Sequence, residues 1–182
     1  MSLVVAPPKI HRLTQKDWSL IYPFIKTNTQ DLPEGFFSSY PTPESIDANN
    51  VFGIFDVYGD LASIAQAKFG ENMTSTEEML APVLPEGIKK SQIVELSGGL
   101  TAYKHRRAGH LKSLIARCKD SVRDTRDCAL TFCHVDNDRA NNFAIANCGS
   151  LVAGNYDFFG ELLNVYREDF NRESETSSSI LL

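Results

Sequence analysis

The spacing of apolar positions predicts three main helices. In the first segment they fall at i, i+3, i+4 and i+7, and the expected buried face is Trp18, Ile21, Tyr22 and Ile25. Pro23 lies inside this segment and is expected to kink or shorten the helix. A second helix is predicted from Gly109 to about residue 126, with the buried face Leu111, Leu114, Ile115, Cys118 and Val122. A third is expected over residues 138–148, closed by Gly149.

Apolar runs of strand length separate these helices. They predict strands over residues 9–13, 51–58, 61–69, 93–103, 128–135, 151–159 and 162–168. Gly59 and Asp60 are expected to form a hairpin turn between the second and third of these strands. Two shorter helices are expected near residues 75–80 and over residues 43–48, where Thr42 supplies an N-cap and Pro43 the first position. Residues 1–170 are predicted to form a single domain, and the polar, Ser-rich segment 171–182 a disordered tail.

Charge and composition exclude several classes of protein. Lys and Arg number 18 and Asp and Glu 23, so the net charge is −5, which argues against general nucleic-acid binding. No apolar run approaches the ~20 residues that cross a bilayer, and the first residues lack the pattern of a signal peptide. The sequence therefore predicts a cytoplasmic protein that binds neither nucleic acid nor membrane.

The cysteines are expected to be reduced residues of the core. Cys118, Cys128, Cys133 and Cys148 form no C-x-x-C pair and lie in predicted helices or strands or at a helix end. A zinc site from Cys128, Cys133, His134 and Cys148 is the alternative, but this spacing matches no standard zinc pattern. No metal is therefore expected.

The stretch that carries the most chemistry joins the strand over 93–103 to the helix after Gly109. A glycine at a helix entrance lets an anion approach the unpaired N–H groups of the first turn, where the helix dipole also favours negative charge. Lys104, His105, Arg106 and Arg107 add positive charge there. Gly98 and Gly99 inside the strand indicate a bulge or a close backbone approach. The stretch is typical of a pyrophosphate cradle; the alternative is a polar-capped helix with a solvated basic loop.

The order β-α-α-β-β-β-α-β-α-β-β, with this loop after the fourth strand, resembles the GNAT superfamily of N-acetyltransferases. Arg106 and Gly109 match the family's Q/R-x-x-G-x-G/A motif, whereas Leu111 replaces its last Gly or Ala. Residues 137–154 are similar to the family's Asn-rich helix and following strand, with Ser150 in place of an aromatic. The resemblance implies an α/β (α+β) fold. Its sheet would be mixed but mostly antiparallel, with about seven strands, about four helices and a splayed central strand pair.

The resemblance also implies a binding site for acetyl-CoA. The pyrophosphate would bind the loop amides, the pantetheine would lie along residues 97–101, and an N–H near Leu100 would contact the acetyl carbonyl. One of two asparagines in the later helix would face the pantetheine. The implied cofactor residues are Leu100, Thr101, Arg106, Arg107, Ala108, Gly109, His110, Leu111, Asn141 and Asn142.

Candidate catalytic residues follow from the same comparison. Glu95, in the strand before the loop, stands where a general base occurs in one branch of the family; the alternative is a strand glutamate that faces solvent or pairs with a lysine. The position of the usual thiolate-protonating tyrosine holds Ile145, so Tyr156, Tyr103 or water would substitute, and Tyr156 is the residue chosen. The aromatic residues Phe36, Phe37 and Tyr40 are the expected acceptor pocket.

Together these features predict an acetyl-CoA-dependent N-acetyltransferase. It would act on a primary amine, in a small molecule or a peptide, by direct attack in a ternary complex, with a homodimer left open. The competing hypothesis is a non-catalytic acyl-CoA-binding or regulatory module on the same fold, which Leu111 and Ile145 favour.

Overall fold

One seven-stranded sheet, in the order β1-β2-β3-β4-β5-β7-β6, organises the chain. The computed structural model describes residues 8–30, 39–158 and 160–170, so Phe36 and Phe37 lie outside the described residues. The strands are β1 (Ile10–Leu13), β2 (Asn50–Phe55), β3 (Leu61–Lys68), β4 (Ile93–Thr101), β5 (Cys128–His134), β6 (Ser150–Phe158) and β7 (Glu161–Asp169). Neighbouring strands are antiparallel except β4 and β5, which are parallel. The expected mixed, mostly antiparallel sheet is confirmed.

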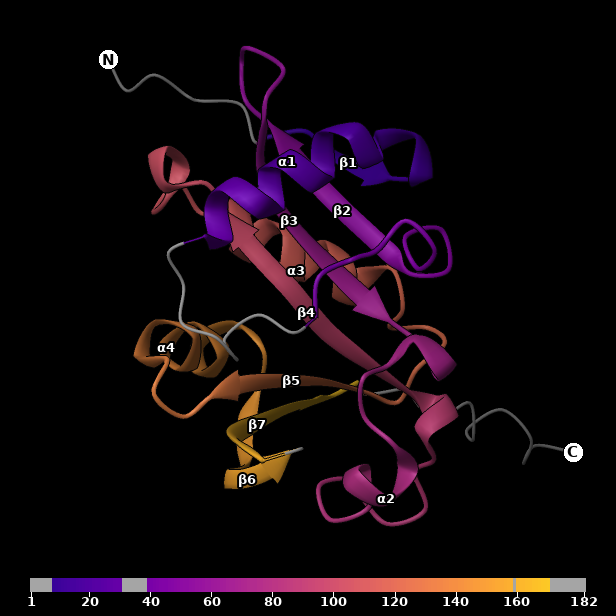
Figure 1. Cartoon of the computed structure of the whole chain (residues 1–182). Coiled ribbons are helices and arrows are strands. Elements are labelled where there is room, and N and C mark those ends of the chain that lie inside the picture. The colour runs from indigo at the N-terminus through magenta and orange to yellow at the C-terminus, as the bar shows by residue number, and fades with distance from the viewer. Residues whose placement is uncertain (1–7, 31–38, 159, 171–182) are drawn as a thin grey trace, which may run out of the picture.

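Helices cover both faces of the sheet (Figure 1). On one face, α3 (His110–Asp120) and α4 (Asp138–Asn147) bury Leu114, Ile115 and Ala144 against the strands. On the other face, α1 (Trp18–Thr29) packs Ile21 and Phe24 on β3 and β4, while the short α2 (Glu77–Leu80) covers a separate apolar cluster. The second face thus carries two apolar clusters, here called the α1 cluster and the α2 cluster.

The two central strands separate part-way along their length. β4 pairs with β5 only from Ile93 to Glu95, against Cys128 to Leu130, and beyond Glu95 no pairing between them remains in the described residues. β5 instead stays paired with β7 along its whole length. Figure 1 shows β4 and β5 meeting at their right-hand ends and diverging to the left like a V. The splayed strand pair is therefore confirmed, and Glu95 marks its apex.

Two glycines shape the open arm of this V. Gly98 and Gly99 together face a single residue of β3, because the register shifts between Ile64 and Gln66, and Gly98 has a φ of +61°. This is the expected bulge. A Cβ on Gly99 would lie 3.0 Å from Cδ1 of Leu111. The bare backbone of Gly99 thus makes room for the leucine that replaces the family's small residue at the start of α3.

Three helical predictions were wrong in detail. Residues 43–48 form turns, although the bond from Ile46 N–H to the Thr42 carbonyl (3.0 Å) starts a helical pattern, so the second helix along the chain is α2 instead. The second main helix, α3, ends at Asp120 and continues to residue 125 only as turns. Of the kink or shortening expected at Pro23, the shortening does not occur: α1 continues to Thr29, with Ile21 and Phe24 buried on either side of the proline.

No helix in the described part of the chain combines the length and the apolar character of a membrane span.

Candidate functional site

The turn before α3 is shaped to receive an anion. Arg107 and Gly109 both have left-handed backbone, with φ of +68° and +78°. The first hydrogen bond of α3 runs from Ser113 N–H to the Gly109 carbonyl (3.1 Å), so the amides ahead of Ser113 have no acceptor within the helix. A Cβ built on Gly109 would meet nothing within 4 Å, so the space over these amides is open. A left-handed arginine is costly and is typical of functional turns.

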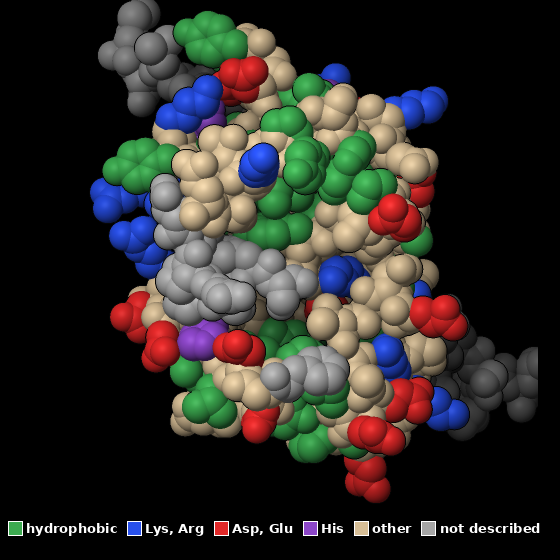
Figure 2. Space-filling model, in the orientation of Figure 1, with side chains coloured by type: hydrophobic (Ala, Val, Ile, Leu, Met, Phe, Trp, Pro, Cys, Tyr) green, Lys and Arg blue, Asp and Glu red, His purple; other side chains and the backbone are tan. Residues whose placement is uncertain are grey.

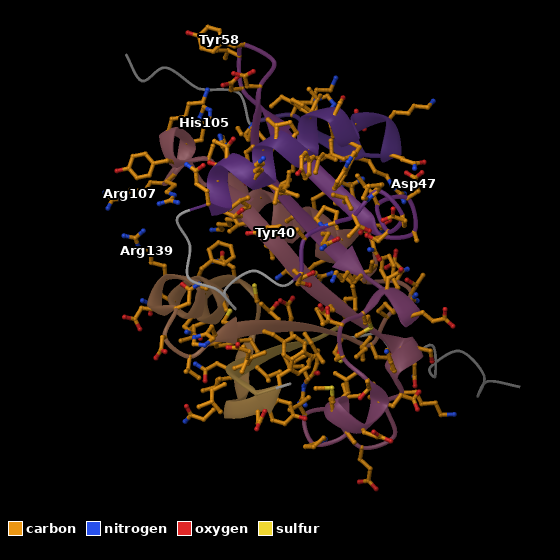
Figure 3. All side chains as sticks on the ribbon, in the orientation of Figure 1. Tyr40, Asp47, Tyr58, His105, Arg107 and Arg139 are labelled. Carbon is orange, nitrogen blue, oxygen red and sulfur yellow. The ribbon has the colours of Figure 1, made fainter. Side chains whose placement is uncertain are left out.

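The basic residues of this turn divide into two groups. Lys104 Nζ and His105 Nε2 lie 3.0 and 3.2 Å from Oδ2 of Asp56, so both tie the turn to the β2–β3 hairpin. Arg107 instead projects outward, as does Arg139 from α4 across the mouth of the V (Figure 3). Figure 2 shows Lys and Arg side chains gathered along this edge. The charge available to an anion is therefore that of the arginines.

Glu95, at the apex, is buried and fully engaged. Its side chain is 3 % exposed. Oε2 accepts from Thr74 N–H (3.0 Å) and the Ser75 hydroxyl (3.4 Å), and Oε1 accepts from the hydroxyls of Thr74 (3.2 Å) and Ser39 (3.3 Å). These donors stabilise a negative charge on the carboxylate. A carboxylate has about four acceptor positions, and all four are occupied here. A further proton donor would therefore have to displace one of the three longer bonds, which come from hydroxyl groups that can rotate.

Lys68 is the counter-charge of Glu95. Its Nζ lies 3.9 Å from Oε1 of Glu95 and its side chain is 9 % exposed. The same nitrogen donates to the hydroxyls of Ser39 (2.6 Å) and Thr74 (3.2 Å), which both donate on to Glu95. Burial lowers the pKa of Lys68, and the charge of Glu95 opposes that shift. The two charges therefore form a buried pair bridged by hydroxyl groups.

This pair belongs to a polar block on the face of the sheet that carries α1 and α2. Gln66 faces Ser97, and Lys68 faces Glu95, in the register of β3 and β4. Ser39 covers the block, since its carbonyl accepts from Nε2 of Gln66 at 2.5 Å. The α1 cluster lies on one side of the block and the α2 cluster on the other.

Tyr40 borders the same block. It packs against the α1 cluster, and Figure 3 shows it over the middle of the sheet. Burial raises the pKa of its phenol. Of the three aromatic residues expected to form an acceptor pocket, Tyr40 is the described one, and it lies next to Ser39.

Solved structures share the fold of this chain. A putative acetyltransferase from Salmonella typhimurium, solved with acetyl-CoA, superposes with a TM-score of 0.66 at 13 % identity, over 95 % of this chain and 99 % of that one. An acetyltransferase of the GNAT family from Streptococcus pneumoniae gives a TM-score of 0.64 at 10 % identity, over 91 % and 100 %. The chain has the GNAT fold.

A third GNAT-like structure is the ribosomal-protein-S18-alanine N-acetyltransferase of Escherichia coli. It superposes with a TM-score of 0.64 at 11 % identity, over 94 % of this chain and 99 % of that one. No protein-family model matches the chain, and no curated protein matches it in sequence. At these identities the likeness establishes the fold alone.

Within this GNAT fold, the open edge of β4 offers backbone amides to the V. Ala102 N–H donates to the Ala62 carbonyl of β3 (3.0 Å). Because backbone N–H groups alternate sides along a strand, Leu100 also points toward β3 and Thr101 toward the V. Leu100 is buried in the α1 cluster. Of these two expected cofactor residues, Thr101 is the better placed to donate its N–H across the opening.

The two asparagines of α4 differ in their contacts. Asn141 is buried: its Nδ2 donates to the carbonyls of His134, Val135 and Asn137, and its Oδ1 accepts from Tyr166 and Asn164. These bonds fix the connection between β5 and α4. Asn142 is exposed on the same helix. Of the two, Asn142 has the side chain free to turn toward a ligand.

Tyr156 holds β6 to α2. It packs in the α2 cluster, and its hydroxyl donates to the carbonyl of Met79. Ile145, at the position of the family's usual acid, is 62 % exposed. For Tyr156 to protonate a thiolate, its bond to Met79 would have to break.

Tyr156→Phe is therefore expected to lower the free energy of unfolding by about 1 kcal/mol, the usual worth of one hydrogen bond. Turnover at saturating substrate should stay within about twofold, because the proton would come from water. Thermal melts and steady-state rates of the purified variant test this. A large fall in turnover at unchanged melting temperature would instead identify Tyr156 as the acid.

The thiols are unsuited to nucleophilic catalysis. All four cysteines are free and buried, as expected. Burial raises the pKa of Cys128 to about 11 and that of Cys133 to about 12. In the described ranges, no three His, Cys, Asp or Glu side chains lie close enough together to hold a metal ion.

Sequence reasoning missed most of the network around Glu95. The sequence pattern does not identify Ser39, Lys68, Thr74 or Ser75, although it leaves open a lysine paired with Glu95 as the alternative to a base. One signal was available: Lys68 ends a run of strand residues and falls on the same face as Gln66, two positions earlier. The other donors come from loops, whose contacts no periodicity predicts.

Proposed function

We propose that this chain is an N-acetyltransferase that moves an acetyl group from acetyl-CoA to a primary amine in a ternary complex. The observation that carries the proposal is the separation of β4 and β5 directly after Glu95. The buried carboxylate of Glu95 lies at the apex of the resulting opening. The turn before α3, with its unpaired amides, lies at the rim. The acetyl-CoA bound by the Salmonella typhimurium protein of the same fold supports the proposal.

The residues at the rim fit acetyl-CoA. The open space over Gly109 and the unpaired amides up to Leu111 suit a pyrophosphate, and Arg106, Arg107 and Arg139 supply positive charge. Burial and the neighbouring His105 lower the pKa of His110, so its ring adds no charge there near neutral pH. Acetyl-CoA supplies the thioester, the amides of this turn hold its phosphates, and Thr101 and Asn142 face the arm between them.

Glu95 takes the proton that the amine must lose. The amine nitrogen bonds to the thioester carbon, the carbon–sulfur bond breaks, and coenzyme A leaves as a thiolate that takes a proton from water. The proton that the ammonium form of the amine loses before the attack passes to the Ser39 or Thr74 hydroxyl, which gives its own proton to Glu95 along a bond of 3.3 or 3.2 Å. The second proton, which the nitrogen loses after the attack, passes to water. Lys68 fixes both hydroxyls in place. The high thiol pKa values support direct transfer, since no cysteine is prepared to carry the acetyl group.

A non-catalytic acyl-CoA-binding module is the second candidate. The observation that favours it is the absence of a ready acid among the described residues at the usual place, since Ile145 is exposed and Tyr156 bonds Met79. Both candidates predict that acetyl-CoA binds. They differ in whether amines release coenzyme A.

Calorimetric titration with acetyl-CoA, with desulfo-CoA and ATP alongside, tests the shared part. We expect micromolar binding of acetyl-CoA and desulfo-CoA and no binding of ATP at the same concentrations. A screen of primary amines with thiol detection then separates the candidates: release of coenzyme A that depends on an amine supports the transferase. Binding without any such release would make the module the better description, and no binding at all would reject both.

A further inference from the structure

Two buried oxygen atoms of the polar block lack partners. In the part of the chain that the structure describes, Oε1 of Gln66 and Oγ of Ser97 are both inaccessible and form no hydrogen bond. The orientation of the Gln66 amide is set by its contacts, because the Ser39 carbonyl can only accept and must therefore face Nε2. Gln66 as a whole is 0 % exposed. A free carbonyl oxygen at such a position is costly to leave unpaired.

Both oxygens lie close to Glu95 in the register of β3 and β4. Gln66 and Ser97 are register partners, and Ser97 stands two residues from Glu95 on the same side of β4. Ser97 and Gly98 are half-buried and Gly99 is exposed, so this part of the strand reaches the V. Ser97 thus lies on the β4 arm of the V two residues beyond Glu95, and Gln66 lies opposite it on β3.

We propose that Gln66 Oε1 and Ser97 Oγ form the subsite that holds the nitrogen of the acceptor amine. This inference rests on the proposed function and deepens it. Two acceptors match the two N–H groups that a neutral primary amine keeps while its lone pair attacks. An amine nitrogen bound there gives each of the two oxygens a hydrogen-bond donor. Because both oxygens are unpaired in the empty site, these new hydrogen bonds contribute to the binding free energy.

The same block selects against amines that carry a carboxylate beside the nitrogen. Among the described residues, the cation in contact with the block is Lys68, and it already donates to Ser39 and Thr74 and faces Glu95. The carboxylate of such an amine would lie near that of Glu95, and no further cation among the described residues of this block would offset the repulsion between them. The acceptor class is therefore a primary amine without an adjacent acid, such as an amine of a small molecule or the amino end of a peptide, rather than a free α-amino acid.

Coenzyme A conjugates test the subsite without requiring turnover. Three are made through an S-linked acetamide: N-methyl, N,N-dimethyl, and the amide of glycine with its free carboxylate. On the wild-type protein, calorimetry should show the N-methyl conjugate binding about tenfold tighter than the N,N-dimethyl one, which has no N–H to donate. The glycine conjugate should bind at least about tenfold more weakly than the N-methyl one.

Ser97→Ala removes an oxygen that has no partner, so its melting temperature should not fall. In this variant we expect the affinity advantage of the N-methyl over the N,N-dimethyl conjugate to drop severalfold. In the double variant Ser97→Ala with Gln66→Met, this advantage should disappear. Ser121→Ala, which removes a hydroxyl bonded to the Cys118 carbonyl and to Asn50, is the matched control and should keep the full advantage.

Failure of coenzyme A itself to bind would reject the proposed function. Coenzyme A binding with equal affinity for the N-methyl and N,N-dimethyl conjugates would reject the subsite alone. The subsite would also be rejected if Ser97→Ala kept the full advantage. Equal or tighter binding of the glycine conjugate would overturn the assigned amine class.

Discussion

Gly109→Asp is expected to weaken the binding of acetyl-CoA by at least about 100-fold, whereas Gly109→Asn should weaken it only severalfold. Position 109 has a φ of +78°, and a side chain there would enter the open space over the amides of α3. Asn and Asp have the same shape and both tolerate left-handed backbone better than other residues. The difference between the two variants therefore isolates the effect of one negative charge.

The size of that effect follows from Coulomb's law. Two unit charges 4 Å apart near a protein surface interact with about 4 kcal/mol, and a 100-fold loss of affinity corresponds to about 2.7 kcal/mol. A pyrophosphate beside the aspartate carboxylate would meet a repulsion of this order. The repulsion should shrink at high ionic strength, because salt screens charges near the surface.

Calorimetric titration of both variants, at about 50 and 500 mM salt, measures the difference, and thermal melts show that both remain folded. Similar melting temperatures are expected, since the backbone cost is shared. Equal affinities for acetyl-CoA in the two variants would show that the phosphates bind elsewhere. The whole description of the turn before α3 would then be wrong, whatever the role of Glu95.

The fold and this turn were accessible from the sequence because their signals are local. Glycines indicate backbone requirements directly: Gly109, at a helix entrance, and Gly98, inside a strand, both adopt positive φ. Strand and helix periodicities lie within one segment, and most boundaries follow them. Residues 43–48 failed because good capping chemistry predicts where a helix can start and not whether packing continues it.

The surroundings of Glu95 could not be predicted in the same way. Its partners come from β3, from the segment after residue 38 and from the connection before α2, all distant in sequence. Only the register of β3 against β4 brings Lys68 opposite Glu95. A one-residue change of that register would place the lysine on the other face of the sheet, so the pair is a property of the tertiary structure. Leu111 is similar, since only its contact with Gly99 explains why a large residue fits there.

Glu95→Gln is expected to reduce turnover by about 10²- to 10⁴-fold, the range that a positioned general base contributes. Gln has nearly the same shape but cannot accept the proton. The Michaelis constant for acetyl-CoA should be unchanged, because the turn proposed to hold the phosphates lies beyond the far end of β4. Residual activity should rise with pH, since a larger fraction of the amine is then already neutral.

The same substitution should destabilise the protein. Removing one member of a buried ion pair costs about 3 kcal/mol or more, because the remaining charge is left unbalanced. Here that charge is on Lys68, whose pKa burial already lowers and Glu95 partly restores. Without Glu95 the pKa of Lys68 falls further. The unfolded chain keeps this lysine protonated up to about pH 10. Between the lowered pKa of Lys68 in the folded variant and pH 10, the unfolded state therefore binds more protons, and the free energy of unfolding rises with pH. The destabilisation of Glu95→Gln should therefore shrink between pH 7 and pH 9.

The double variant Glu95→Gln with Lys68→Met separates catalysis from stability. It removes both charges, so it should be more stable than Glu95→Gln alone near pH 7 and lack the added pH dependence. Its turnover should remain as low, because the proposed base is still missing. The control is Glu168→Gln in β7, which removes a carboxylate 2.5 Å from Lys119 of α3. This control should leave turnover unchanged. Recovery of turnover in the double variant would show that Glu95 serves the structure and that another group takes the proton.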